Sequence, residues 1–429
     1  MYTHAWIIIV SMAGTFVITR WLKLTTELAI FAAAIVGGII HTRSFPVRHL
    51  VEGTFTYLDI CLIFITATLF INLLKKAGGI TFIIREIIKK FQNRRTVCLL
   101  LLTLVLLIPG ALTGAGAVTV FTTGTLVGTV LTYMGIDKTR STAIIFVCAT
   151  MSAAAPPINL WAMMAAAGAN MPYVGFMGPL FVLAVTGALI TMFVLGRKGT
   201  PVDLEKALAE LPEPPKEMNW IRVMLPFIVF FGLLIAGRLW PFSMPILGLP
   251  LMFIIATLVV ILVNPTRLPV VEIAGDTMRS LIPLVGIMIV IGSLIQIMAL
   301  SGARGMVSLG VVTLPLWVLF AGLWLIAPVA QGVFQYAVAP LLGVPLVFLF
   351  DMEGVNIIIG LSALAVMWPL GDGLPPTAVV GRAAILELKY EGRYYRDFLK
   401  TASVPIFIIL MICTLFLIFS NQLTFLIGG

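Results

Sequence analysis

The sequence predicts an all-α polytopic membrane protein with about ten spans plus two re-entrant hairpins, organised as two inverted repeats. Composition indicates the membrane class, because 60% of the 429 residues are hydrophobic and only 10% are charged. Soluble domains carry about 25% charged residues, and the mean hydropathy here is +1.12. The repeats are indicated by proline pairs at 156–157 and 375–376, which interrupt long apolar segments. Each pair begins 47 residues after an earlier proline, Pro109 or Pro328 (156 − 109 = 47; 375 − 328 = 47).

The two sets of prolines are 219 residues apart (328 − 109 = 219), which is close to half the chain. The same offset carries Gly135-Ile136-Asp137 onto Gly354-Val355-Asn356. One proline spacing could align by chance, but a proline, a proline pair and a turn are less easily aligned together. A duplicated pattern of broken apolar segments is typical of secondary transporters, in which each half contributes an unwound helix to a site near the membrane midplane.

The apolar runs predict the spans in order along the chain. They lie near 4–19, 26–40, 55–74, 141–170 (broken at Pro156), 176–196, 222–237, 247–263, 280–300, 357–385 (broken at Pro375) and 402–420. Two further apolar stretches, 97–134 and 313–349, have centres rich in Gly and Pro. Each is too long for one span and lacks a polar loop for two, so we expect re-entrant hairpins that enter and leave on one side. Such backbone is tolerated only where protein or a water-filled cavity surrounds it.

The distribution of Lys and Arg favours this topology. If Arg20 and Lys23 are cytoplasmic, 23 of the 27 basic residues fall inside. Those outside are Arg43, Arg48, Arg238 and Arg304. Treating the hairpins as simple spans would scramble the sides of the later segments, so the positive-inside bias supports hairpins. In a membrane protein this bias also accounts for the net charge of +9, and nucleic acid is not an expected partner.

The topology divides the chain into five parts. Two N-terminal spans at 1–54 precede the first repeat, 55–196, which holds the hairpin 97–134 and the broken span 141–170. A cytoplasmic linker and two spans occupy 197–275. The second repeat, 276–420, enters from the other side and holds the hairpin 313–349 and the broken span 357–385. The remaining residues, 421–429, form a C-terminal tail.

Segment 80–95 places Phe82, Ile83, Ile87 and Phe91 on one helical face. This pattern predicts an amphipathic helix on the inner membrane surface, with a solvated cytoplasmic helix as the alternative.

The first hairpin tip supplies candidate ligands for an ion or substrate. Gly110 and Gly114 let the chain unwind and turn backbone carbonyls toward a cation, and Thr113 adds a hydroxyl. Helix N-termini that face such a site would attract an anion such as a carboxylate. The alternative is a Gly-rich face used only for helix packing.

The first break supplies a second group of candidates. Pro156 and Pro157 remove two backbone donors and so free preceding carbonyls, which suit the hard ion Na⁺. Ser152 and Asn159 add polar side chains at the predicted depth of the membrane. Simple hydrogen bonding between helices is their alternative role.

The second half repeats both groups with different polar residues. Its candidate site residues are Gln331, Gly332 and Gln335 at the hairpin, and Gly371, Asp372, Gly373, Pro375, Pro376 and Thr377 at the break. Asp372 is the acid that we place near the midplane, where a carboxylate is costly and functional by default, either as a Na⁺ ligand or as a proton carrier. The alternative is that its depth is misjudged.

Several classes of function are not indicated. There is no Gly-x-x-x-x-Gly-Lys-Ser/Thr motif for an ATP-driven motor, no hydrolase triad and no His-Glu-x-x-His motif. The four cysteines form no Cys-x-x-Cys pair and the three histidines have no metal-ligand spacing. We therefore expect no enzyme, no cofactor and no bound metal beyond Na⁺, and an ion gradient or passive movement as the driving force.

The run from Leu74-Lys75-Lys76-Ala77-Gly78-Gly79, through the basic arm, to Gly110-Ala111-Leu112-Thr113-Gly114 and on to Pro156-Pro157 resembles a known family. It is similar to the large membrane (M) subunit of tripartite ATP-independent periplasmic (TRAP) transporters, in which a Gly-rich tip, a Gly-hydrophobic-Asp turn and a Pro-Pro break follow in this order. The second break at Pro375-Pro376 and the length agree. The resemblance covers about 55–420 and extends to the wider ion transporter superfamily of elevator-type symporters.

The resemblance implies a scaffold, which includes 1–54 and 197–275, and a moving transport domain made of the hairpins and broken spans. It implies Na⁺-coupled uptake of a small organic acid, such as a dicarboxylate, across a bacterial or archaeal cytoplasmic (inner) membrane. The partners implied are a small four-span membrane subunit and a periplasmic substrate-binding protein, besides membrane lipid.

The sequence departs from the family pattern at Thr113-Gly114-Ala115, where serine is usual, and at Asp372, where an uncharged residue is usual. The first break also lacks the usual Gly before its prolines. Two alternatives therefore stay open: a stand-alone Na⁺- or H⁺-coupled carboxylate symporter, or an ion/proton antiporter that uses Asp372.

Overall fold

The computed structural model describes residues 2–240, 242–243, 245–313 and 315–427. Helices make up 78% of the chain, and the described part has no β-strand. Nine helical segments in that part are long and apolar enough to cross a membrane, and four shorter apolar helices accompany them. The prediction of a multi-pass α-helical membrane protein is therefore confirmed. The predicted tail at 421–429 includes 428 and 429, which lie outside the described residues.

The first half of the chain forms eleven α-helices and one π-helix. These are α1 (Tyr2–Trp21), α2 (Thr26–Thr42), α3 (Val47–Thr54), α4 (Leu58–Lys76), α5 (Gly79–Phe91), α6 (Arg95–Thr113), α7 (Gly116–Thr119), the π-helix η1 (Val120–Gly124), α8 (Thr125–Tyr133), α9 (Lys138–Ala154), α10 (Leu160–Gly168) and α11 (Met177–Leu195). The linker carries α12 (Leu204–Glu210). The pair α13 (Trp220–Leu239) and α14 (Leu249–Val263) follows.

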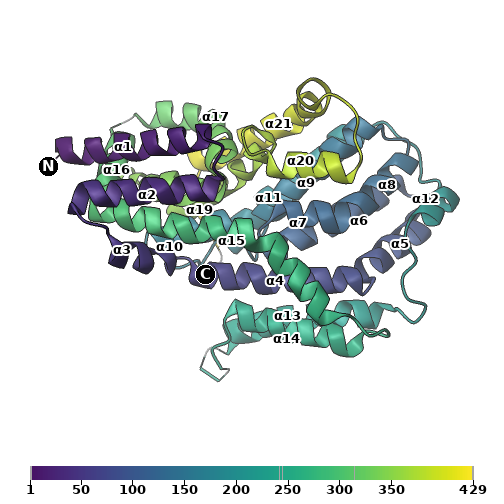
Figure 1. The fold of residues 1–429 in the computed structure, drawn as a ribbon. Coiled ribbons are helices and arrows are strands. Elements are labelled where there is room, and N and C mark those ends of the chain that lie inside the picture. Colours follow the sequence, from purple (N-terminus) through teal and green to yellow (C-terminus); the bar gives the residue numbers. More distant parts are fainter. Residues whose placement is uncertain (1, 241, 244, 314, 428–429) are drawn as a thin grey trace.

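The second half begins with one long helix. α15 (Val270–Leu300) has 31 residues with Pro283 inside it, and Figure 1 shows it bent. The elements after it are α16 (Ala303–Val312), α17 (Leu316–Phe334), η2 (Gln335–Ala337), the π-helix η3 (Ala339–Gly343), α18 (Val344–Met352), α19 (Ile357–Met367), η4 (Pro369–Gly373), α20 (Val379–Glu387), η5 (Tyr394–Leu399), α21 (Lys400–Ile418) and η6 (Thr424–Ile427). The span predicted at 280–300 thus begins ten residues earlier (280 − 270 = 10), because the helix continues through charged residues that hydropathy does not detect.

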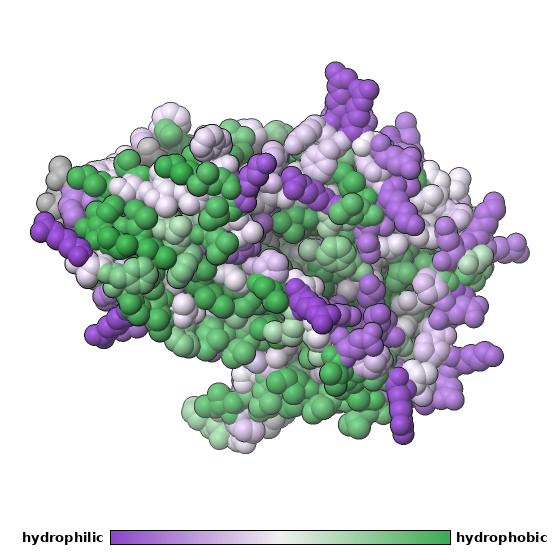
Figure 2. All heavy atoms as spheres, viewed as in Figure 1, coloured by the Kyte–Doolittle hydropathy of each residue, from purple (hydrophilic) through white to green (hydrophobic). Residues whose placement is uncertain are grey.

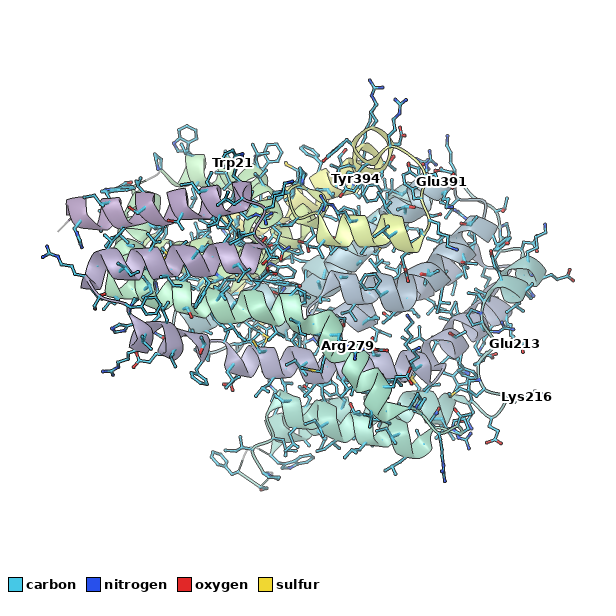
Figure 3. All side chains as sticks on the ribbon, viewed as in Figure 1. Trp21, Glu213, Lys216, Arg279, Glu391 and Tyr394 are labelled. Atoms are coloured by element: carbon cyan, nitrogen blue, oxygen red, sulfur yellow. The ribbon has the colours of Figure 1, made fainter. Side chains whose placement is uncertain are left out.

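The helices pack in two groups. α2, α3 and α4 pack on α15, with α1 on α2 and with α14 and α13 beside α4. The other group centres on α9, which packs on α6, α11 and α21, while α17 and α19 pack on the second break. Most helices run along the long dimension of the molecule in Figure 1. Hydrophilic residues gather mainly at one end in Figure 2, and Figure 3 places Glu213 and Lys216 of the linker at that end.

Both ends of segment 95–134 lie beside the linker. The guanidinium of Arg95 donates to the carbonyls of Gly196 and Arg197. At the other end, the carbonyl of Met134 accepts from the amide of Thr200 at 2.8 Å. Since the linker contacts the start of α6 and the end of α8, the chain enters and leaves this segment at one end of the molecule.

The offset of 219 residues also relates the bounds of whole elements. The π-helix η1 begins at Val120 and η3 begins at Ala339 (339 − 120 = 219), and the two have the same length. The same relation holds between α8 and α18, and between α10 and α20. Both proline pairs have cis peptide bonds, and Gly135 and Gly354 both have positive φ. The offset of the sequence motifs is therefore an offset of local backbone structure.

The apolar face of α5 packs on protein. Ile80, Ile83 and Ile87 are buried, and the ring of Phe82 meets Trp220 edge to face at 5.4 Å. On the opposite side Arg85 donates to the carbonyl of Leu211 at 2.8 Å, which fastens the linker to this helix. The amphipathic pattern is confirmed, and protein covers the apolar face; the position of the helix at the inner membrane surface stays a prediction.

Candidate functional site

Asn159 joins the two ends of the first break. α9 ends at Ala154 and α10 begins at Leu160, because the prolines between them cannot donate the helical hydrogen bonds. The side-chain oxygen of Asn159 accepts from the amide of Ala162 at 2.9 Å, and its Nδ2 donates to the carbonyl of Ala154 at 2.9 Å. One buried amide thus satisfies an orphan donor of α10 and an orphan carbonyl of α9.

The first hairpin tip packs on this break. α6 ends at Thr113, and Gly114 takes the left-handed conformation with φ 72°. The carbonyl of Ala111 accepts from the amide of Ile158 at 3.1 Å. A Cβ on Gly110 would collide with Ser152, so only glycine permits this approach.

The hydroxyl hydrogens near this tip already have acceptors. Thr113 Oγ1 donates to the carbonyl of Pro109 at 2.8 Å, and Ser152 Oγ donates to the carbonyl of Ala149 at 2.8 Å. The Thr119 hydroxyl lies 2.6 Å from Ser152 Oγ and, with that hydrogen committed, donates to it. Both predicted hydroxyl ligands are therefore oriented by protein and keep lone pairs for another donor or a cation.

The second break packs in the same way on the second hairpin. Gly371 lies so close to Pro328 that a Cβ would meet its carbonyl. The carbonyl of Gly332 accepts from Thr377 twice, from its hydroxyl at 2.8 Å and from its amide at 3.2 Å. Tyr394 donates to the carbonyl of Gly373 at 2.7 Å. Gly332, Gly371 and Thr377 therefore fix the break against the hairpin, whereas Gly373 is held by Tyr394 of η5.

A chain of buried side chains connects the two halves. Trp161 Nε1 of α10 donates to Gln331 Oε1 at 2.8 Å, and Gln331 Nε2 donates to Asp372 Oδ1 at 2.7 Å. Trp161 and Gln331 are fully buried, and Asp372 is only 5% exposed. Because the indole can only donate, it fixes the oxygen of the amide toward itself and so turns the NH₂ group toward the carboxylate. None of the ion pairs in the described part of the chain includes Asp372.

The two hairpin tips meet at Tyr336. Its hydroxyl lies 3.4 Å from the carbonyl of Gly114 in the first tip, to which it donates. Its ring lies against that of Trp161, with centroids 4.8 Å apart. The first break, the first tip and the second hairpin are thus in contact around Asp372.

A cavity of about 10 Å³ adjoins Asp372, which is close to the space that one water molecule needs. Its lining comprises Ala117, Leu284, Gln331, Gln335, Tyr336, Asp372, Val379 and Val380. Gln335 is only 9% exposed, and its Oε1 has no hydrogen-bond partner in the protein. A buried acceptor without a donor is expensive, so a donor or a cation is expected in this cavity.

A wider cavity of about 310 Å³ adjoins the small one and shares Ala117 and Leu284 with it. α4 contributes Asn72, Lys75 and Lys76 to its lining, and α15 contributes several polar groups, among them Asp276. Figure 2 shows a hollow in this face between α15 and α20, the helices that supply Leu284 and the two valines of the small cavity. The wider cavity therefore borders the small cavity beside Asp372 and has several polar side chains in its lining.

Five of the predicted site residues line cavities, in two separate places. Gln331, Gln335 and Asp372 surround one cavity, whereas Pro156 and Pro157 line apolar hollows that face α13. The sequence did not predict three residues that lie at or near this site, Trp161, Tyr336 and Asn72. Asn72 had the clearest signal, since it is a polar residue inside an apolar span.

The described residues contain no group of three or more His, Cys, Asp or Glu that could hold a metal ion. The side chains of the small cavity that could coordinate a cation, Asp372, Gln335 and Tyr336, would do so through oxygen atoms, which suit a hard monovalent cation and do not suit zinc or copper. The predicted absence of an enzyme cofactor is not tested by these residues.

The fold is that of a multi-pass α-helical membrane protein in which two broken spans meet around a buried polar site. No family model matches the sequence, and no curated protein matches it.

Among solved structures the chain is similar to MtrF of Neisseria gonorrhoeae, which illustrates a class of antimetabolite efflux pumps. The TM-score is 0.64 at 13% identity, over 91% of this chain and 94% of MtrF. It is also similar to the YdaH transporter of Alcanivorax borkumensis, which has an unusual topology, with a TM-score of 0.55 at 14% identity, over 87% and 88% of the two chains. At these identities the similarity shows the fold alone and does not single out the TRAP family.

Proposed function

We propose that the chain is a secondary active transporter in which a cation bound at Asp372 drives the movement of a small organic acid. The observation that carries the proposal is the small cavity itself. It joins a carboxylate without a basic partner to the unpaired amide oxygen of Gln335, both buried between the hairpin and the break. A bound cation would satisfy both groups.

Na⁺ is the coupling ion that these ligands favour. Carboxylate and amide oxygens suit hard cations, and the cavity has room for about one water-sized particle. A proton on Asp372 is the second candidate, because an acid at this depth also serves as a proton carrier. That reading corresponds to an ion/proton antiporter.

Inverted repeats and an elevator motion are proposed for the mechanism. Support comes from the 219-residue offset of element bounds, and from the linker that contacts both ends of the first hairpin. Two halves of opposite orientation give a protein two mirror-related shapes, which is the basis of alternating access. We propose that α1–α4 and α13–α15 stay fixed as a scaffold, and that the hairpins and broken spans move.

The substrate class rests on charge and on the family resemblance. Lys75 and Lys76 border the wider cavity, where they can attract a carboxylate on its way to the site. Uptake across a bacterial or archaeal cytoplasmic membrane, with a four-span subunit and a periplasmic binding protein, is the TRAP-type form of the proposal. A stand-alone carboxylate symporter is the other form, and MtrF shows that this fold also serves efflux. Copurification of a four-span subunit from the native membrane would separate the partnered form from the stand-alone form.

The first experiment is the thermal stability of the purified protein in NaCl and in choline chloride at equal ionic strength. A ligand at 100 times its Kd stabilises the folded state by about 2.7 kcal/mol, so Na⁺ should raise the Tm of the wild type. Asp372→Asn should abolish the rise. Asp351→Asn, which removes an exposed carboxylate at the end of α18, should retain it.

The outcomes separate the candidates. A Na⁺-specific rise that Asp372→Asn removes supports the coupling site, and carboxylates would then be screened in Na⁺. No Na⁺ effect, combined with stabilisation of the wild type at low pH, would replace Na⁺ by a proton. The same Na⁺ response in both variants would remove Asp372 from the site.

A further inference from the structure

Two apolar hollows lie along one side of α13. The first, of about 300 Å³, is lined by α6, α11 and the first break on one side and by Met224, Phe227 and Phe231 of α13 on the other. The second, of about 570 Å³, is lined by the segment 173–177, by Leu234 and Arg238 of α13, and by α14. Pro157 belongs to both linings, so the two hollows adjoin each other at this residue.

The two adjoining hollows together form a groove along α13, and this groove has the length of a lipid acyl chain. It follows α13 from Met224 to Arg238, which are 14 residues apart (238 − 224 = 14). At 1.5 Å per residue this distance is about 21 Å. One leaflet contributes about 15 Å of hydrocarbon to a bilayer core of about 30 Å, so the groove accommodates an acyl chain that enters from the bilayer surface.

A positively charged side chain lies at one end of the groove, where α13 ends. Arg238 is the charged residue of the two linings, it is exposed, and the ion pairs of the described residues do not include it. Trp240 is 56% exposed and Phe242 fully exposed just beyond it. Exposed aromatic side chains beside a basic residue at a helix end are typical of the level of the lipid headgroups. Arginine at that level matches the geometry of a phosphate.

We propose that this groove is a phospholipid site. Arg238 binds the phosphate, and one acyl chain lies along α13 from Leu234, past Pro157, to Phe227 and Met224. The groove does not fit the transported organic acid, because the α13 side chains that line it beyond Arg238, from Leu234 to Met224, are apolar, and the opposite wall adds one hydroxyl, that of Tyr173. The lipid site itself does not depend on the transported ion or substrate, and only its role between sliding helices rests on the proposed function.

The position of the lipid gives it a role between two groups of helices. α13 and α14 form one wall, while α6, α11 and the first break form the other. The acyl chain therefore fills a seam that direct contacts between side chains leave open. A lipid in the seam keeps the two groups of helices packed while allowing them to slide, because its chain has no fixed hydrogen bonds.

The test is native mass spectrometry of the full chain, extracted from its membrane in a mild detergent and washed by repeated detergent exchange. The wild type should keep one phospholipid per chain. Arg238→Gln should lower the fraction of lipid-bound protein at least tenfold, and Val185→Trp, which fills the groove from α11, should lower it similarly. Arg43→Gln, which removes an exposed arginine at the end of α2, should match the wild type.

Three results would overturn the proposal. The first is equal phospholipid retention by the wild type, Arg238→Gln and Val185→Trp. The second is retention of a free fatty acid or detergent in place of a phospholipid, which would remove the phosphate from the site. The third is equal loss from Arg43→Gln and Arg238→Gln. If Val185→Trp does not fold, the pair of arginine variants still decides the question.

Discussion

Trp161→Phe tests whether the indole N–H orients the amide beside Asp372. Phenylalanine keeps a ring against Tyr336, whose centroid lies 4.8 Å from that of Trp161, and removes only the donor and one ring of the indole. Gln331 Oε1, now 2.8 Å from that donor, would be left buried without a partner. The amide could then rotate and turn its oxygen toward the carboxylate, which also only accepts.

The magnitude follows from the burial. Leaving a fully buried acceptor unsatisfied costs about 1–3 kcal/mol, whereas removal of an exposed donor costs little. Gln331→Leu removes the acceptor. In that background the indole N–H of Trp161 already lacks its hydrogen bond, so Trp161→Phe should cost less than it does in the wild type. We therefore expect a double-mutant cycle to give a coupling energy of about 1 kcal/mol or more between Trp161 and Gln331. Trp317→Phe, at an exposed position of α17, is the control for the same chemical change.

The assay is thermal unfolding in detergent for the four proteins of the cycle, with and without Na⁺. Trp161→Phe should also weaken apparent Na⁺ binding, and a loss of 1.4 kcal/mol corresponds to tenfold in Kd. A coupling energy near zero together with an unchanged Na⁺ Kd would refute the orienting role of the indole. Loss of stability with unchanged Na⁺ binding would leave Trp161 as a packing residue only.

Three further predictions concern packing, capping and the approach to the site. Gly371→Ala should lower the Tm, because overpacking against the Pro328 backbone costs about 1–3 kcal/mol. Gly305→Ala, whose Cβ would have open space, should leave the Tm unchanged, and equal effects of the two variants would contradict the close-packing argument. Asn159→Ala should cost about 1–2 kcal/mol by thermal unfolding through loss of the helix cap, and unchanged stability would remove its bridging role. Lys75→Met should raise the apparent KM for an anionic substrate in proteoliposomes, and an unchanged KM would place the path elsewhere.

Local rules were sufficient for the helix breaks and turns. Prolines 156 and 157 cannot donate to a helix, and α9 indeed ends at Ala154 just before them. Gly135 and Gly354 of the duplicated turn both have positive φ, and Asp137 and Asn356, two residues further on, cap α9 and α19. Such features depend on a few neighbouring residues, so the sequence contains nearly all the information that they require.

The features that could not be predicted from the sequence depend on contacts between residues far apart in the chain. The spacing of the isoleucines of α5 fits a helical face that contacts lipid as well as one that contacts protein, and only the fold shows that protein covers them. The N-terminal part of α15 carries Glu272, Asp276 and Arg279, so its hydropathy resembles a loop although the chain is helical. Trp161 reads in the sequence as an ordinary core aromatic. Its partner Gln331 is 170 residues away, and no local pattern joins them.

The matching bounds of the paired elements also limit how the chain can change in length. From α8 through α10, and from α18 through α20, every helix start keeps the same offset, so neither stretch has gained or lost a net residue relative to the other. One residue inserted into α9 would rotate everything after it by about 100° about the helix axis, and would turn Trp161 away from Gln331, its hydrogen-bond partner 170 residues further along the chain. Insertions and deletions should therefore be excluded from these stretches during evolution, and affinity tags or reporter domains belong outside them.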